Sequence, residues 1–98
     1  MVSLNGKTVL ITGASSGIGA ACAHACAGLD ARLLLAARRV ERLEKLAPEI
    51  YAQHGVEVRT LQLDVRDQPA VEAAINNLPT AWAAVDILVN NAGLSRGL

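Results

Sequence analysis

The sequence predicts an α/β fold, a parallel β-sheet with helices on both faces, and three observations support this prediction. Short runs rich in Val, Leu and Ile alternate along the 98 residues with segments whose apolar side chains recur at helical spacing. The chain is 52% hydrophobic with almost no aromatic residues, a composition typical of strands that are buried on both faces. The resulting order, β-α-β-α-β-α-β, favours right-handed crossovers between parallel strands.

Two strands and the helix between them are expected in the first third of the chain. The run TVLIT, Thr8 to Thr12, predicts the first strand, which Gly13 closes. Small and apolar residues from Ile18 onward follow helical spacing, and this helix should end near Gly28. The run RLLLAA, Arg32 to Ala37, predicts the second strand.

The remaining residues continue the same alternation. An apolar stripe predicts a second helix that closes near Gly55, with a kink or late restart at Pro48, because proline lacks an amide hydrogen and crowds the carbonyl four residues earlier. The stripe consists of Leu43, Leu46, Ala47, Ile50 and Tyr51. Val56 to Leu63 alternates as a third strand, a third helix should start near Pro69, and Val85 to Asn90 predicts the fourth strand.

Charge and composition exclude several classes of partner. Nine Lys and Arg residues balance nine Asp and Glu residues, so the zero net charge favours neither nucleic acid nor an anionic membrane. The apolar runs fall well short of the ~20 residues that span a bilayer, and the N-terminus lacks a signal-peptide pattern. Cys22 and Cys26 alone give no disulfide framework. We therefore expect a cytoplasmic protein with no nucleic-acid or membrane partner.

The segment TGASSGIG, Thr12 to Gly19, lies between the first strand and the first helix. Small residues there let the backbone approach a pyrophosphate, and the helix N-terminus supplies free N–H groups. The glycines, Gly13, Gly17 and Gly19, are not spaced as G-x-G-x-x-G, so a tight turn without a ligand is the alternative. The position between a strand and a helix favours a phosphate-binding loop.

TGASSGIG resembles the cofactor loop of the short-chain dehydrogenases/reductases, whose pattern is T-G-x-x-x-G-x-G. DILVNNAG, Asp86 to Gly93, is similar to that family's second signature, N-N-A-G at the end of the fourth strand, and Asp64 with Val65 matches a third. The stretch LPTAWAAVDILVNNAGL also resembles a subgroup, the NADP-dependent 3-hydroxy acid (serine-type) dehydrogenases. The resemblance spans nearly the whole chain and implies a Rossmann-type fold that binds a dinucleotide.

The end of the second strand predicts NADP rather than NAD. An NAD site needs an acidic residue there for the ribose 2′-hydroxyl, and Ala37 holds that position. Arg38, Arg39 and Arg42 follow, and cations crowded at a helix N-terminus are unfavourable unless an anion lies among them. Guanidinium groups suit a 2′-phosphate, and the resemblance implies the same, since NADP-preferring members carry arginine here. A solvated basic turn, partly neutralised by neighbouring glutamates, is the alternative.

Two further strand ends supply candidate cofactor contacts. Asp64 ends the third strand and can either cap the next turn or face the crevice at the sheet edge; the resemblance favours a hydrogen bond to adenine, with the Val65 backbone alongside. The resemblance also assigns Asn91 to the nicotinamide ribose and leaves Asn90 mainly structural. The full set of expected cofactor-binding residues is Gly13, Ser15, Ser16, Gly17, Ile18, Gly19, Arg38, Arg39, Asp64, Val65 and Asn91.

The segment CAHAC, Cys22 to Cys26, raises the possibility of a metal site. Helical spacing places the two cysteines on one face and turns His24 to the other. Cysteine as a small buried hydrophobe explains the pair better, so we expect no bound metal. His54, beside Gly55 in a predicted loop, is expected on the surface.

The resemblance implies a catalytic tyrosine, a lysine four residues later and an upstream serine, because hydride transfer to a carbonyl needs a proton donor. The single tyrosine is Tyr51, which is followed four residues later by Gly55, and the lysines are Lys7 and Lys45. We therefore expect no catalytic residue here, and interpret residues 1–98 as the amino-terminal part of a single dinucleotide-binding domain. Without a further strand, the apolar fourth strand would leave one edge of the sheet unpaired, and this supports the interpretation.

The function that these features predict is that of an NADP(H)-dependent short-chain oxidoreductase. Hydride would pass between the nicotinamide and a small hydroxyl or carbonyl substrate, and the resemblance implies a dimer or tetramer of the full-length form. A free-standing nucleotide-binding module without catalysis is one alternative. A non-binding structural fragment that a partner chain keeps folded is another.

Overall fold

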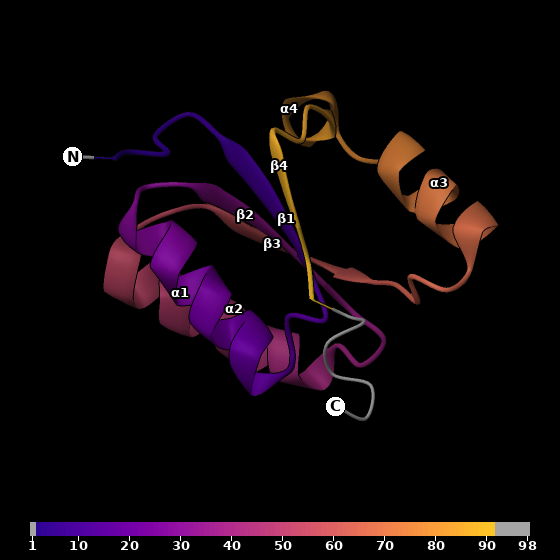
Figure 1. Cartoon of the computed structure of the whole chain (residues 1–98), viewed down its shortest axis with the longest axis horizontal. Helices are drawn as coiled ribbons and strands as arrows, with labels where there is room; N and C mark the ends of the chain where they lie inside the picture. The colour runs from indigo at the N-terminus through magenta and orange to yellow at the C-terminus, as the bar shows by residue number, and fades with distance from the viewer. Residues whose placement is uncertain (1, 92–98) are drawn as a thin grey trace.

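The computed structural model describes residues 2–91 and shows one four-stranded sheet with helices on both sides (Figure 1). All neighbouring strands are parallel, in the order β3-β2-β1-β4. The strands are β1 (Thr8–Thr12), β2 (Arg32–Ala37), β3 (Val58–Gln62) and β4 (Ile87–Asn90). The helices are α1 (Gly17–Gly28), α2 (Glu41–His54), α3 (Gln68–Asn76) and α4 (Thr80–Ala83). The predicted fold class is confirmed.

The two central strands alternate their side chains between two apolar cores. Val9 and Ile11 of β1, with Leu33 of β2, face α1 and α2, and all three are fully buried. Leu10 and Leu34 point to the opposite face, where they pack with Trp82 of α4 and with side chains of α3. Because successive strand residues point to opposite faces, a strand covered on both sides must be apolar throughout.

Helix α2 differs from its prediction in two respects. It runs without a restart from Glu41 to His54 and contains Pro48, so the late restart is wrong, while the other predicted outcome, a kink at Pro48, stays a prediction. Pro48 is exposed, while Leu46 and Ile50 on either side of it are buried. Burial of these two side chains outweighs the roughly 3 kcal/mol that a proline inside a helix costs.

Tyr51 does not belong to the buried stripe of α2, because its side chain is 63% exposed. Leu43, Leu46 and Ile50 form the buried face. At 100° per residue, position 51 lies at the margin of that face, so the prediction that placed Tyr51 on the stripe is wrong.

The other differences concern bounds and one short helix. Strands β1 and β2 have their predicted bounds, whereas β3 and β4 are shorter than expected. The four-residue helix α4 was not predicted, and its Trp82 is 8% exposed beneath Arg32, whose guanidinium carbon lies 4.0 Å from the ring centroid. No helix within residues 2–91 is both long enough and apolar enough to cross a bilayer.

Candidate functional site

The carboxyl ends of the four parallel strands meet at one edge of the sheet. The register places Thr12 of β1 beside Ala36 of β2 and Asn90 of β4, and Ala37 of β2 beside Gln62 of β3. The segments that leave these strands are the glycine loop (residues 13–19), the arginine turn (residues 38–42), the turn that begins with Asp64, and Asn91. The predicted site residues therefore gather at the edge where ligands bind in open parallel sheets.

The glycine loop turns sharply from β1 into α1. Gly13 has a φ of 63°, a left-handed conformation that favours glycine. Ser16 caps α1, because its hydroxyl oxygen accepts a hydrogen bond from the Gly19 amide at 3.0 Å and its hydroxyl donates to the Gly13 carbonyl at 3.0 Å. The Ser16 hydroxyl is thus committed to the loop itself, and the loop offers a ligand mainly its backbone amides.

Gly19 is required by close packing of backbone on backbone. A Cβ atom at this position would overlap the Gly13 carbonyl oxygen and would lie 2.8 Å from the Ala14 Cα atom. At Gly17, by contrast, none of the described residues outside its chain neighbours and its own helix backbone has a heavy atom within 4 Å of the Cβ position. The start of α1 therefore packs tightly on the loop at Gly19 and leaves open space at Gly17.

Asn91 joins the end of β4 to the glycine loop. Its side-chain Nδ2 donates to the Gly13 carbonyl at 3.1 Å and to the Ser16 hydroxyl oxygen at 2.8 Å. Its backbone amide donates to the Thr12 hydroxyl oxygen at 3.1 Å, and that hydroxyl donates to Asn90 Oδ1 at 2.9 Å. Asn91 is 2% exposed, and none of the described residues donates a hydrogen bond to its Oδ1.

The role that the sequence suggested for Asn91, contact with the nicotinamide ribose, stays a prediction. The contacts of its amide nitrogen are structural, as those of Asn90 were expected to be. Ala92 and Gly93 of the second signature lie outside the described residues.

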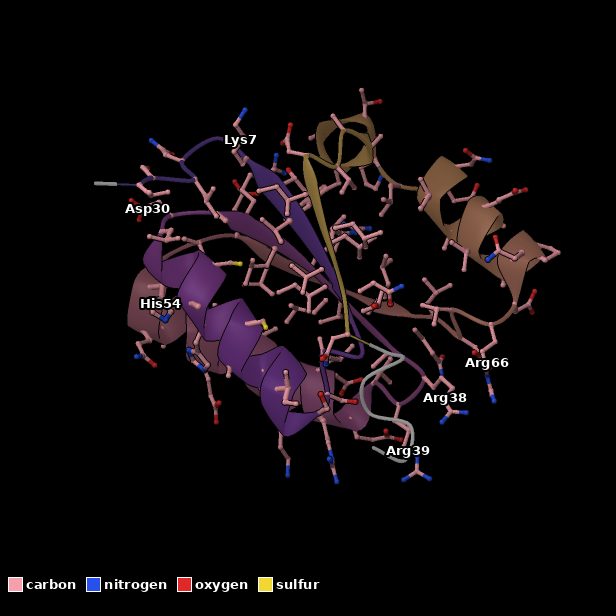
Figure 2. The ribbon with its side chains drawn as sticks, in the orientation of Figure 1. Lys7, Asp30, Arg38, Arg39, His54 and Arg66 are labelled. Atoms are coloured by element: carbon pink, nitrogen blue, oxygen red, sulfur yellow. The ribbon has the colours of Figure 1, made fainter. Side chains whose placement is uncertain are left out.

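The arginine turn presents positive charge at the start of α2. Arg38 and Arg39 are exposed immediately after β2, and Figure 2 shows both side chains extending from the same end of the molecule as Arg66. The turn is held by Gln62, whose side-chain nitrogen donates to the Arg38 carbonyl at 3.2 Å. Helix α2 begins after Val40, with no side-chain cap among the described residues. An uncapped helix start beside guanidinium groups favours an anion.

A solvated basic turn, partly neutralised by neighbouring glutamates, was the alternative interpretation of this sequence. Glu41 and Glu44 lie in the first turn of α2, where they suit the helix dipole. None of the ion pairs found among residues 2–91 joins them to Arg38, Arg39 or Arg42. Direct ion pairing is therefore not seen among the described residues, while the exposed Arg38 and Arg39 fit a solvated turn as well as an anion site. The assignment of the turn to an anion stays a prediction.

A groove of about 230 Å³ lies between the glycine loop and α2. Its lining residues are Ala14, Ser15, Ala20, Arg42, Lys45, Leu46 and Glu49. Arg42 spans it, with its guanidinium 3.5 Å from the Ser15 carbonyl oxygen. The sequence did not identify Lys45 as part of the site, although its spacing of three residues from Arg42 places both cations on one face of a helix.

Asp64 forms a two-pronged ion pair with Arg66. The guanidinium donates from Nη2 to Oδ2 at 2.9 Å and from Nε to Oδ1 at 3.1 Å, and the Arg66 backbone amide donates to Oδ1 at 3.0 Å. These hydrogen bonds, with a smaller effect of the Arg38 charge, lower the pKa of Asp64 from 3.8 to about 2. Asp64 therefore caps its turn, as one of its two interpretations held, and the adenine contact stays a prediction. Val65 packs on the core beneath α3 and α4.

Replacing Arg66 with glutamine should raise the pKa of Asp64 from about 2 toward 3.8, because the strongest hydrogen bonds to the carboxylate are lost. The folded pKa lies below the unfolded value, so the ion pair stabilises the fold above the unfolded pKa and ceases to do so as pH falls toward 2. A carboxyl NMR titration measures this change. Arg59→Gln, elsewhere on the sheet, is the control; a low Asp64 pKa in Arg66→Gln would contradict the assigned cause.

The described residues contain no tyrosine and lysine arranged as a catalytic pair. Tyr51 is exposed on α2, and Lys7 precedes β1, at the edge opposite the glycine loop (Figure 2). His54, expected on the surface, is half-buried, with its Nε2 3.2 Å from Nδ1 of His24. Within residues 2–91 no group of three or more His, Cys, Asp or Glu side chains is placed to hold a metal ion.

Comparison with known proteins identifies the family of this chain. Residues 7–98 match the family model described as short chain dehydrogenase. The chain is 46% identical over 98 residues to an NADP-dependent 3-hydroxy acid dehydrogenase of Schizosaccharomyces pombe, covering 99% of this chain and 38% of the relative. It is 51% identical over 87 residues to sulfoacetaldehyde reductase 2 of Chromohalobacter salexigens, covering 89% and 34%.

The solved structures that resemble this chain are also those of reductases and dehydrogenases. L-sorbose reductase from Gluconobacter frateurii, complexed with NADPH and L-sorbose, superimposes with a TM-score of 0.85 at 39% identity, over 94% of this chain and 35% of that one. An alcohol dehydrogenase from Thermococcus sibiricus, complexed with 5-hydroxy-NADP, gives 0.77 at 43% identity, over 84% and 35%. The chain spans about a third of the length of each of these four proteins. It belongs to the short-chain dehydrogenase family.

Proposed function

We propose that this chain carries the cofactor-binding part of an NADP(H)-dependent short-chain oxidoreductase. The reaction is hydride transfer between the nicotinamide and a small hydroxyl or carbonyl substrate. The observation that carries the proposal is the arginine turn: an uncapped helix start flanked by guanidinium groups, with Ala37 where an NAD site would place a carboxylate. Family membership and the NADP or NADPH named for several relatives support it.

The 2′-phosphate of the cofactor is assigned to the arginine turn. Arg38 and Arg39 are its proposed ligands, and Arg42 and Ser15 border the same region from the groove. Exposed guanidinium groups bind phosphate in a two-pronged manner, with shorter and stronger hydrogen bonds than neutral donors make. A carboxylate in this place would repel the phosphate, and none of the described acidic side chains is paired with these arginines.

The pyrophosphate is assigned to the glycine loop and the first turn of α1. The open space at Gly17 leaves room for phosphate oxygens near the helix N-terminus, where backbone amides and the helix dipole favour negative charge. Ile18 is 58% exposed beside it and offers an apolar contact to the cofactor. Asn91 and Ser16 hold the loop in this shape through the hydrogen bond between them and through their hydrogen bonds to the Gly13 carbonyl.

The adenine is assigned to Asp64 and the Val65 backbone, and the nicotinamide ribose to Asn91. The ionised Asp64 carboxylate retains acceptor capacity beyond its bonds to Arg66. The unpaired Oδ1 of Asn91 is an acceptor at the sheet edge, immediately after the strand that the family resemblance places near the nicotinamide. When bound, the nicotinamide supplies or accepts the hydride. The residues described above bind and orient the dinucleotide.

The whole protein is proposed to be a cytoplasmic homo-oligomer, a dimer or tetramer, of which residues 1–98 form the amino-terminal part of a single dinucleotide-binding domain. Its catalytic serine, tyrosine and lysine are proposed to lie outside these residues. Family membership supports these points, together with the share of its relatives that the chain covers.

Replacing Arg38 with alanine should weaken NADPH binding by about ten- to a hundredfold and leave NADH binding nearly unchanged, because a charge-assisted hydrogen bond to the 2′-phosphate is lost. Titration of both cofactors against the whole protein, followed by nicotinamide fluorescence, measures the two dissociation constants. Arg59→Ala, an exposed arginine on β3, is the matched control and should change neither. Equal losses for NADPH and NADH would refute the assignment of Arg38.

A further inference from the structure

A pair of histidines joins α1 to α2, far from the sheet edge that carries the proposed cofactor site. Nδ1 of His24 in α1 lies 3.2 Å from Nε2 of His54, the last residue of α2, and the ring centroids are 5.4 Å apart. The two helices run side by side in the same direction, since Arg42 near the start of α2 meets Ser15 before α1. Figure 2 shows His54 at the end of the molecule remote from Arg38 and Arg39.

We propose that His24 and His54 form a two-histidine chelate for a divalent late transition metal such as Zn²⁺. Two nitrogens that are each about 2.0–2.1 Å from a tetrahedral zinc ion are about 3.3 Å apart. The facing nitrogens, at 3.2 Å, already have nearly this separation. Neutral imidazole nitrogen is a favoured ligand of zinc, copper and nickel.

The proton balance of metal binding is simple. In the hydrogen-bonded pair one facing nitrogen carries a hydrogen and the other accepts it. When the metal binds, the donor ring moves its hydrogen to its other ring nitrogen, so that both facing nitrogens present lone pairs. No net proton is released, and each lone pair must turn by about 35° away from the line between the two nitrogens to point at a tetrahedral ion.

The surroundings of the pair leave room for a metal with water as its remaining ligands. Both histidines are half-buried, so one side of the pair faces solvent. Gly28, one turn after His24, has no side chain to crowd the site; a Cβ there would come 3.8 Å from His54 Cε1. Cys22 and Cys26 pack against the core between the sheet and these helices. The proposed chelate therefore has two protein ligands, His24 and His54, because no third His, Cys, Asp or Glu within residues 2–91 is placed to join them.

The expected consequence is structural. A metal held by both rings cross-links α1 to α2 and binds the folded state in preference to the unfolded one, so it stabilises the fold. Because His54 lies away from Arg38 and Arg39, the metal should not affect the dinucleotide site. This inference therefore does not depend on the proposed function.

Zinc titration of the purified protein tests the proposal, with thermal unfolding and calorimetry as readouts. The unmodified protein should bind one Zn²⁺, and its Tm should rise with zinc concentration. His24→Gln and His54→Gln should each weaken zinc binding by about tenfold or more, because one of two protein ligands is lost. The Cys22→Ala/Cys26→Ala variant should bind zinc as the unmodified protein does.

Two outcomes would overturn the chelate: zinc binding that survives in His24→Gln/His54→Gln, or zinc binding that is lost only in the cysteine variant. A ¹⁵N NMR titration of the unmodified protein avoids any variant that misfolds. His24 Nδ1 and His54 Nε2 should shift together on zinc addition, while shifts confined to the two outward-facing ring nitrogens would refute the geometry. NADPH affinity, measured in parallel, should not change with zinc.

Discussion

Replacing Gly19 with alanine is expected to lower the free energy of unfolding by about 3 kcal/mol or more, because two stretches of backbone must move apart. The added Cβ would overlap the Gly13 carbonyl oxygen, lie 2.8 Å from the Ala14 Cα atom and lie 2.9 Å from Nδ2 of Asn91. The first two of these atoms belong to the backbone. No rotamer change can relieve the overlap, so the loop or the helix must shift.

That shift should also abolish tight cofactor binding. The Gly13 carbonyl accepts hydrogen bonds from Asn91 Nδ2 and from the Ser16 hydroxyl. Displacing it separates the glycine loop from β4 and removes the cap arrangement at the start of α1. The backbone amides assigned to the pyrophosphate would then lose their alignment, and binding energy that depends on a preorganised loop would be lost.

Gly17→Ala is the matched control, two residues earlier in the same loop. Its Cβ position is more than 4 Å from every described heavy atom outside its chain neighbours and its own helix backbone, and its φ is not positive. This substitution should therefore leave stability unchanged or raise it by about 0.4–1 kcal/mol. Urea denaturation followed by circular dichroism gives both free energies. Equal destabilisation by the two substitutions would contradict the packing described for Gly19.

The central strands could be predicted from sequence because both of their faces are covered. Each residue from Leu33 to Ala37 is buried, so a continuous apolar run marks the strand directly. The ends of β3 were harder to predict. Its ladder with β2 begins at Val58, opposite Leu33, although alternation in the sequence begins at Val56. The bounds of an edge strand depend on its partner, which its own residues do not specify.

Contacts between distant residues account for most of what the sequence did not predict. Asn91 and Ser16, which form a hydrogen bond, are 75 residues apart in the sequence, and Arg32 and Ala81 are 49 residues apart. The sequence around each residue gives no sign of such a pair. The His24 and His54 pair likewise depends on how α1 and α2 lie side by side. The Asp64 and Arg66 pair is different, since a carboxylate two residues before an arginine in a turn is a local signal that was open to prediction.

The second large effect is expected for Ile50→Ala, which should lower the free energy of unfolding by about 2–5 kcal/mol, through lost burial and the cavity left behind. The Ile50 side chain is fully buried between α2 and the sheet, in the cluster that includes Leu35 and Leu43. Ile50→Val keeps most of the side-chain volume and should lower it by about 0.5–1.5 kcal/mol. A graded series of this kind separates cavity formation from a change in helix propensity, because alanine is the better helix former.

Tyr51→Ala, at the next position of the same helix, is the control for orientation. Its side chain is 63% exposed, so its removal should change the free energy of unfolding by about 0.5 kcal/mol or less. The higher helix propensity of alanine should offset part of any loss. Pro48 makes this comparison informative, because a helix that restarted after it would rotate the following residues and exchange the environments of positions 50 and 51. A larger loss for Tyr51→Ala than for Ile50→Ala in urea denaturation would mean that α2 does not run continuously through Pro48.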